Sequence, residues 1–258
     1  MDGNEKMQKM KKLTNVIMKI KKKLKVIERE IKRISRSLNR KKYLSFGENC
    51  LADDILSRYN LKSFSSPFAS GRANVEYVLQ FQKENYKDFL NPQFLKYGYE
   101  GDLKVVRHKK YNELSNVYED SCMKGFEFTH HDIIADEKKR ASIERRVRRI
   151  QSLKNCTLYI FYHHRFCKDT DINLLIQHLN ELKTIYEKQC EKVYLIAFTQ
   201  KLVSSEQERK VDKEYIDGIY MYYFYTLNVW CGNNQDIFWA RCDDDLISQM
   251  IGDIKELL

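Results

Sequence analysis

The sequence YLSFGENCLADDIL, residues 43–56, joins a short strand, a tight turn and the start of a helix. Aromatic and aliphatic residues dominate 43–46, as is typical of a buried strand, and Gly47 permits a sharp turn after it. Apolar residues then recur at helical spacing over 51–56, with acidic residues in the first turn. The pattern predicts that Cys50 lies at a helix N-terminus, where backbone N–H groups can lower a thiol pKa or hold an oxyanion.

Outward from this stretch, strands and helices alternate along the chain. We expect strands at 125–129, 157–162, 193–198 and 216–227, and helices at 72–85, 136–153, 171–188 and from 243 onward. Strands separated by helices of this length predict the α/β class, with a mostly parallel sheet that is covered by helices on both faces.

The N-terminal arm has a different composition from the rest of the chain. Residues 1–42 hold 16 basic and 4 acidic side chains, whereas the remainder holds 30 basic and 32 acidic ones. Apolar residues alternate in steps of three and four at Met10, Leu13, Ile17, Ile20, Leu24, Ile27, Ile31, Ile34 and Leu38. This heptad register predicts a basic coiled-coil helix over residues 1–41, followed by an α/β domain over 42–258.

The coiled coil predicts self-association through residues 10–38. Isoleucine at the d positions disfavours a parallel dimer, so a trimer or tetramer is expected. Two other interpretations stay open: the apolar seam could fold back on the body, or the basic helix could lie on an anionic membrane surface.

Composition limits the cellular setting. The 258 residues include seven scattered cysteines without a CxxC pair, which indicates a reducing compartment rather than a disulfide framework. We find neither a signal peptide nor an apolar run of membrane-spanning length, so a cytoplasmic protein is expected, with peripheral contact to the inner membrane face as an option. Because the net charge of +10 belongs to the N-terminal arm, specific nucleic-acid binding by the body has no support.

Several chemically reactive clusters follow predicted strands. Asn49 and Cys50, the segment 130–132, the pair 163–164 and the segment 232–234 would share the carboxyl edge of one sheet, where open α/β sheets bind ligands. A thiol beside an imidazole that is oriented by a third group is the arrangement of a cysteine nucleophile. Cys50 would attack, His131 or His130 would act as the base, Asp132 would orient the base or anchor its turn, and Asn49 would help to stabilise an oxyanion.

Other interpretations of the same residues compete with this one. Cys50 could be a small buried residue at a strand–helix junction. The histidines could bind zinc or iron, although no HExxH or CxxC frame is present, and we expect no metal. The arginines of 145–149 could form a solvated helix face or dock a phosphate, for instance on a nucleotide or coenzyme A.

Three pieces of the sequence resemble a known family. SFGENC at 45–50, SPF at 66–68 and FTHHD at 128–132, followed by the RRVRRI helix, resemble a bacterial family of unknown function catalogued as papain-like cysteine peptidases. The resemblance covers about residues 43–240 and implies Cys50 and His131 as the catalytic pair, with Asp132 third. It departs at Ala69-Ser70, where family members tend to have an acidic and an aromatic residue. The opening is also similar to that of capsule-biosynthesis acetyltransferases, which would imply coenzyme A as a cofactor.

The sequence therefore predicts a cysteine-dependent acyl-transfer enzyme, either a hydrolase or an acyltransferase, that acts on a peptide or on a substrate related to surface polysaccharide. If it is a hydrolase, no cofactor is expected. The alternative is a non-catalytic oligomeric module that binds a glycan, a nucleotide or a protein partner. Thiol reactivity separates the two, because a binding module has no need for a reactive Cys50.

Overall fold

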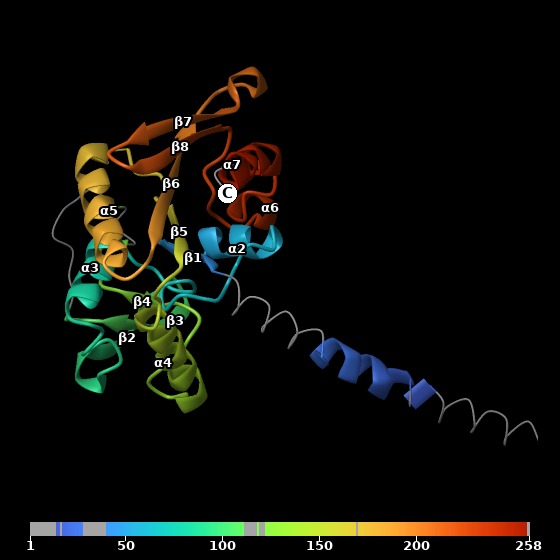
Figure 1. The fold of residues 1–258 in the computed structure, drawn as a ribbon, viewed down its shortest axis with the longest axis vertical. Helices are drawn as coiled ribbons and strands as arrows, with labels where there is room; N and C mark the ends of the chain where they lie inside the picture. The colour runs from blue at the N-terminus through green and yellow to red at the C-terminus, as the bar shows by residue number, and fades with distance from the viewer. Residues whose placement is uncertain are drawn as a thin grey trace, which may run out of the picture. The chain divides into compact units, whose positions relative to one another are not determined.

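The computed structural model describes residues 14–15, 17–27, 40–110, 118, 122–168 and 170–256 (Figure 1). The chain divides into two compact units, residues 1–40 and residues 41–258. No helix in these described ranges is long and apolar enough to cross a membrane.

In the N-terminal unit, the described residues 14–15 and 17–27 are helical. Ile17, Ile20, Leu24 and Ile27 of the predicted seam are all exposed, at 44–54% of their surface. The remaining seam positions lie outside the described residues; they are Met10, Leu13, Ile31, Ile34 and Leu38. A long coiled-coil helix therefore stays a prediction.

The main sheet of the second unit has five strands in the order β1-β5-β6-β8-β7. Their bounds are Lys41–Gly47 (β1), Thr157–His163 (β5), Lys192–Leu202 (β6), Ile219–Thr226 (β8) and Lys210–Ile216 (β7). The first four strands are parallel, and β7 pairs antiparallel with β8. The predicted mostly parallel sheet is confirmed. The strand expected over 216–227 begins later, because Asp217 and Gly218 both have positive φ angles and form the turn between β7 and β8.

Helices cover both faces of this sheet, as Figure 1 shows. Helices α2 (Leu51–Arg58) and α7 (Asp244–Glu256) pack on one face, and α3 (Val75–Lys83) and α5 (Ile172–Glu187) pack on the other. Side chains of β5 alternate between the two cores: Phe161 faces α2 and α7, whereas Tyr162 faces the opposite layer. The remaining short elements near this sheet are η3 (Glu206–Glu208) and α6 (Gln235–Phe238).

A second, three-stranded sheet corrects one prediction. It has the order β2-β3-β4, and its surroundings include η1 (Pro92–Phe94) and α4 (Glu137–Gln151). The strands are Leu95–Glu100 (β2), Leu103–His108 (β3) and Glu127–Phe128 (β4). We expected 125–129 to be a strand of the main sheet, but β4 pairs antiparallel with β3 and Glu127 also bridges to Arg72. The segment 130–132 therefore does not follow a strand of the main sheet.

Candidate functional site

The turn between β1 and α2 places Cys50 at the carboxyl edge of the main sheet. Gly47 pairs with His163 across the two parallel strands, and a Cβ added at Gly47 would lie 3.1 Å from the backbone N and O atoms of His163. Gly47 also has a φ of +153°, which side chains disfavour. Cys50 is the N-cap residue of α2, and its side chain forms no capping hydrogen bond. The half-buried thiol is thus left available for chemistry.

Glu48 anchors this turn from within the protein. Its fully buried carboxylate lies 2.7 Å from the hydroxyl of Tyr162 and 2.7 Å from Nδ1 of His164. The backbone N–H of Arg165 donates to the other carboxylate oxygen at 2.9 Å. His164 continues the network through Nε2, which lies 2.7 Å from Thr170 Oγ1. A buried carboxylate that accepts several hydrogen bonds holds its segment in one conformation.

Asn49 is held by the other histidine of the pair. Its Oδ1 lies 2.9 Å from Nδ1 of His163 and accepts the Leu51 N–H at 3.1 Å, so Nδ1 of His163 carries the proton. The His163 ring stacks on Phe198 with its centroid 5.0 Å away. Burial lowers the pKa of His163 well below its usual value, so this ring stays neutral. Its Nε2 is buried without a hydrogen-bond partner in the described part of the chain.

The environment of Cys50 keeps its side chain protonated. Burial, assisted by the carboxylates of Asp53 and Asp54, raises the pKa of Cys50 to about 11. The charge of Arg72 acts in the opposite direction, as does a backbone hydrogen bond, but both are outweighed. At neutral pH the resting side chain is a thiol rather than a thiolate.

His131 lies in a separate cluster. Its Nδ1 is 3.4 Å from Ser70 Oγ, and its Nε2 is 3.5 Å from an amino group of Arg146. Arg146 also donates to Ser70 Oγ at 2.9 Å. Burial, followed by the positive charge of Arg146, lowers the pKa of His131 to about 4. The imidazole is neutral at pH 7, the state that a general base requires.

Asp132 anchors the turn after β4. Its Oδ1 accepts the N–H groups of Ile134 at 3.2 Å and Ala135 at 3.0 Å, and the hydroxyl of Tyr97 lies 3.3 Å away. These bonds hold the pKa of Asp132 below its usual value. His130 beside it is exposed. Among the described interactions, His131 is thus joined to Ser70 and Arg146, and neither Asp132 nor Cys50 contacts its ring.

A family comparison covers both clusters. A family model described as "putative papain-like cysteine peptidase (DUF1796)" matches residues 41–207, which include the Cys50 turn and His131. The chain belongs to this family. No curated protein and no solved structure matches the chain. The similarity to capsule-biosynthesis acetyltransferases has no counterpart in these comparisons.

Within this family member, the charge of one carboxylate acts on both clusters. Asp53, in the first turn of α2, accepts from Ser45 Oγ at 2.9 Å and pairs with Lys62 at 2.5 Å. Its charge raises the pKa of Cys50 and also acts on Arg146, where it opposes the effect of burial. The carboxylate of Asp53 therefore influences both the Cys50 thiol at the start of α2 and the Arg146 guanidinium beside His131.

Four residues of the site were not among the predicted catalytic residues: Glu48, His163, Ser70 and Arg146. The pairing of β1 with β5 brings Glu48 and His163 to the Cys50 turn, and their position at the carboxyl ends of these strands was the available signal. No group of three or more His, Cys, Asp or Glu side chains in the described ranges is arranged to hold a metal ion.

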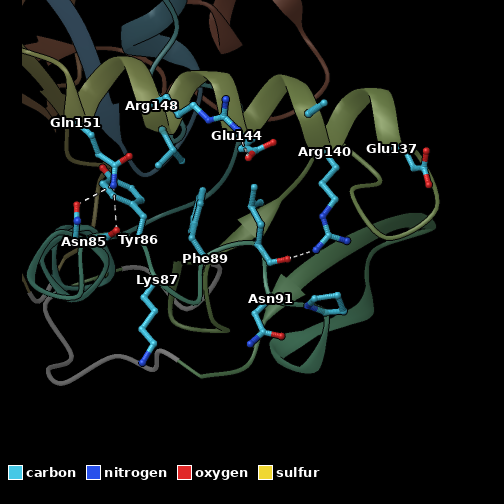
Figure 2. A pocket seen from close by; sticks show the side chains of 14 residues that line it. Asn85, Tyr86, Lys87, Phe89, Asn91, Glu137, Arg140, Glu144, Arg148 and Gln151 are labelled. Atoms are coloured by element: carbon cyan, nitrogen blue, oxygen red, sulfur yellow. Dashed lines mark hydrogen bonds and ion pairs between the residues drawn. The ribbon is translucent and has the colours of Figure 1, made fainter.

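A cavity of about 850 Å³ is lined by none of these residues and lies between residues 85–92 and one side of α4 (Figure 2). Gln151 of α4 donates there to Asn85 at 2.8 Å, and Arg140 donates to the carbonyl of Leu90. Arg146 is absent from the lining of this cavity, because it faces Ser70 and His131 instead. Helix α4 thus directs Arg140 to the cavity and Arg146 to Ser70 and His131.

Proposed function

We propose that the protein is a cysteine-dependent hydrolase of acyl bonds, with Cys50 as the nucleophile. The observation that carries the proposal is the Cys50 turn: Glu48 and Asn49 are both pinned by histidines, while the Cys50 side chain forms no capping bond. A fixed backbone with a free thiol at a helix N-terminus is a preorganised nucleophile. Membership of a family described as cysteine peptidases supports a peptide or related acyl substrate.

The proposed reaction proceeds through a thioester. Cys50 Sγ attacks the acyl carbon while its proton passes to the neutral imidazole of His131, and the leaving group then takes that proton. Water attacks the thioester in the second half, which releases the acid and restores the thiol. The N–H groups of Ala52 and Asp53 have no intrahelical acceptor, so they, together with Nδ2 of Asn49, would stabilise the oxyanion, whereas the Leu51 N–H is already bound to Asn49 Oδ1.

The pKa values of Cys50 and His131 favour proton transfer during the attack on the substrate. They do not favour a thiolate–imidazolium ion pair that exists before substrate binds. The pKa of Cys50 is raised to about 11 and that of His131 is lowered to about 4, so both groups are neutral before substrate arrives. Because the two side chains are not in contact, substrate binding would have to bring the thiol and the imidazole together. Asp132 would then position His131 by holding the turn that follows it, through its hydrogen bonds with the Ile134 and Ala135 N–H groups.

The raised pKa of Cys50 also favours a second candidate, a non-catalytic binding module. Turnover separates the two. We would measure the hydrolysis of p-nitrophenyl acetate and of an acyl thioester by the full chain, by Cys50→Ser and by Cys231→Ser, which alters an exposed cysteine. The hydrolase requires that only Cys50→Ser abolishes turnover. Equal rates in all three proteins would contradict it.

We further propose that the N-terminal unit forms a homo-oligomeric coiled coil. The exposed isoleucines and leucine of 17–27 form part of an unbroken heptad pattern, and apolar seams of this period bury themselves against partner helices. A protein that lacks residues 1–40 should have the mass of a monomer by light scattering, whereas the full chain should be a trimer or tetramer. An unchanged oligomeric state would contradict this proposal.

A further inference from the structure

Arg146 is a half-buried cation whose contacts are uncharged. Its guanidinium donates to Ser70 Oγ at 2.9 Å and lies 3.5 Å from Nε2 of the neutral His131. Among the described residues, no Asp or Glu forms an ion pair with it. A guanidinium has five N–H donors, so these two contacts leave donors available.

Two other half-buried arginines of this unit are neutralised by carboxylates. Arg107 pairs with Glu100 at 2.7 Å and with Glu127 at 3.0 Å, and Arg209 pairs with Asp243 at 2.9 Å. Removing a charge from water is unfavourable unless an opposite charge or enough hydrogen bonds replace the water. Burial accordingly lowers the pKa of Arg146. The absence of such a partner at Arg146 in the described chain points to an anion that arrives from outside.

The position of Arg146 places such an anion beside His131, the proposed general base. Its guanidinium borders His131 and Ser70, and the segment that leads to Ser70 is held at β1 by the bond from Ser66 Oγ to the Ser45 carbonyl at 2.6 Å. The charge of Asp53, three residues after Cys50, also acts on Arg146. Asp53 does not supply the missing partner, because its own carboxylate is bound to Ser45 and Lys62. An anion on Arg146 would thus lie next to the proposed base and towards the start of α2.

We propose that Arg146 and Ser70 bind a carboxylate group of the acyl substrate beside Cys50 and His131. The planar guanidinium fork matches a carboxylate in two parallel hydrogen bonds, and the Ser70 hydroxyl supplies a further donor. This specificity site rests on the proposed function. The same site would also affect catalysis. Burial lowers the pKa of His131 most, and the charge of Arg146 lowers it further. A bound carboxylate would offset the effect of that charge and make the imidazole a stronger base.

Two alkylating reagents of similar size test the site. Iodoacetate carries a carboxylate and iodoacetamide is neutral, so the ratio of their rates at Cys50, read by peptide mass spectrometry, measures selectivity for the anion. Arg146→Gln should lower this ratio about tenfold, a loss typical of one charge-assisted contact. Arg145→Gln, which removes an exposed charge from the same helix, should leave it nearly unchanged. Arg146→Lys should fall between the two.

The outcomes separate this proposal from the one on which it rests. If neither reagent modifies Cys50 in the unaltered protein, the proposed nucleophile is wrong. If both reagents modify Cys50 but Arg146→Gln leaves the ratio unchanged, or Arg145→Gln lowers it equally, the carboxylate site is wrong. Succinate should slow the alkylation by iodoacetamide more than inorganic phosphate does; stronger protection by phosphate would overturn the choice of carboxylate.

Discussion

His163 Nδ1 lies 2.9 Å from Asn49 Oδ1, and this contact ties the end of β5 to the residue directly before Cys50. The same Oδ1 accepts the first N–H group of α2, from Leu51. One amide oxygen therefore fixes the strand edge and the helix start relative to each other. The orientation of the Cys50 side chain depends on both.

Asn49→Ala tests the contribution of the Asn49 Oδ1 contacts to stability. The substitution removes the acceptor of Leu51 N–H and leaves the buried Nδ1–H of His163 unpaired, which should cost about 1–3 kcal/mol of unfolding free energy. Urea denaturation measures that loss, and Asn233→Ala at an exposed position serves as the control. Equal stability of the two variants would show that the Asn49 contact contributes nothing.

Glu48→Gln should be more damaging than its small change in shape suggests. A neutral amide cannot accept at both of its ends, so the hydrogen bonds from Tyr162, His164 and the Arg165 N–H cannot all survive. We expect a loss of about 2–4 kcal/mol. The matched control is Glu144→Gln, which breaks an exposed pair with Arg148 and should cost less than about 1 kcal/mol. A Glu48 variant as stable as the Glu144 variant would refute the anchoring role.

The lowered pKa of His131 predicts a specific pH dependence. Because its pKa is about 4 in the folded protein and 6.5 for an unperturbed histidine, the unfolded chain binds more protons between these values. The contribution to stability is fully present above pH 6.5 and is lost as the pH falls towards 4. His131→Gln should therefore show a shallower decline in unfolding free energy over this window than the unaltered protein, while His163 contributes equally to both. Parallel curves would contradict the lowered pKa.

The raised pKa of Cys50 predicts slow alkylation at neutral pH. The rate constant for iodoacetamide at Cys50 should increase about tenfold per pH unit from pH 7 to 10, because the thiolate fraction does so below a pKa of about 11. Peptide mass spectrometry over a pH series gives this profile. A plateau that begins below pH 8.5 would show a preformed thiolate instead.

Local patterns were sufficient to predict much of the fold. The buried strands β5 and β6 and the amphipathic helices α4 and α5 lie within a few residues of their predicted bounds, because continuous apolar runs and helical periodicity are properties of the segment itself. The edge strand β7 was missed, since its residues are mostly polar and exposed. The pairing of β4 depends on β3 and Arg72, which no local pattern reveals.

The candidate site also has features that the local sequence predicts and features that it does not. The position of Cys50 before a helix follows from the glycine and the apolar spacing around it, and the structure has this arrangement. The contacts of Asn49 with His163 and of His131 with Arg146 join residues that are far apart in the chain. Such contacts depend on strand order and helix packing, so the sequence pattern alone could not predict them.

The most direct test of the proposed chemistry is to locate the acyl group after acid quenching of a reaction between the full chain and p-nitrophenyl acetate. We expect one acetyl group per chain on the peptide that contains Cys50, formed more slowly in His131→Ala and absent in Cys50→Ser. Acetylation that is spread over exposed cysteines and lysines, and is unchanged in Cys50→Ser, would contradict it.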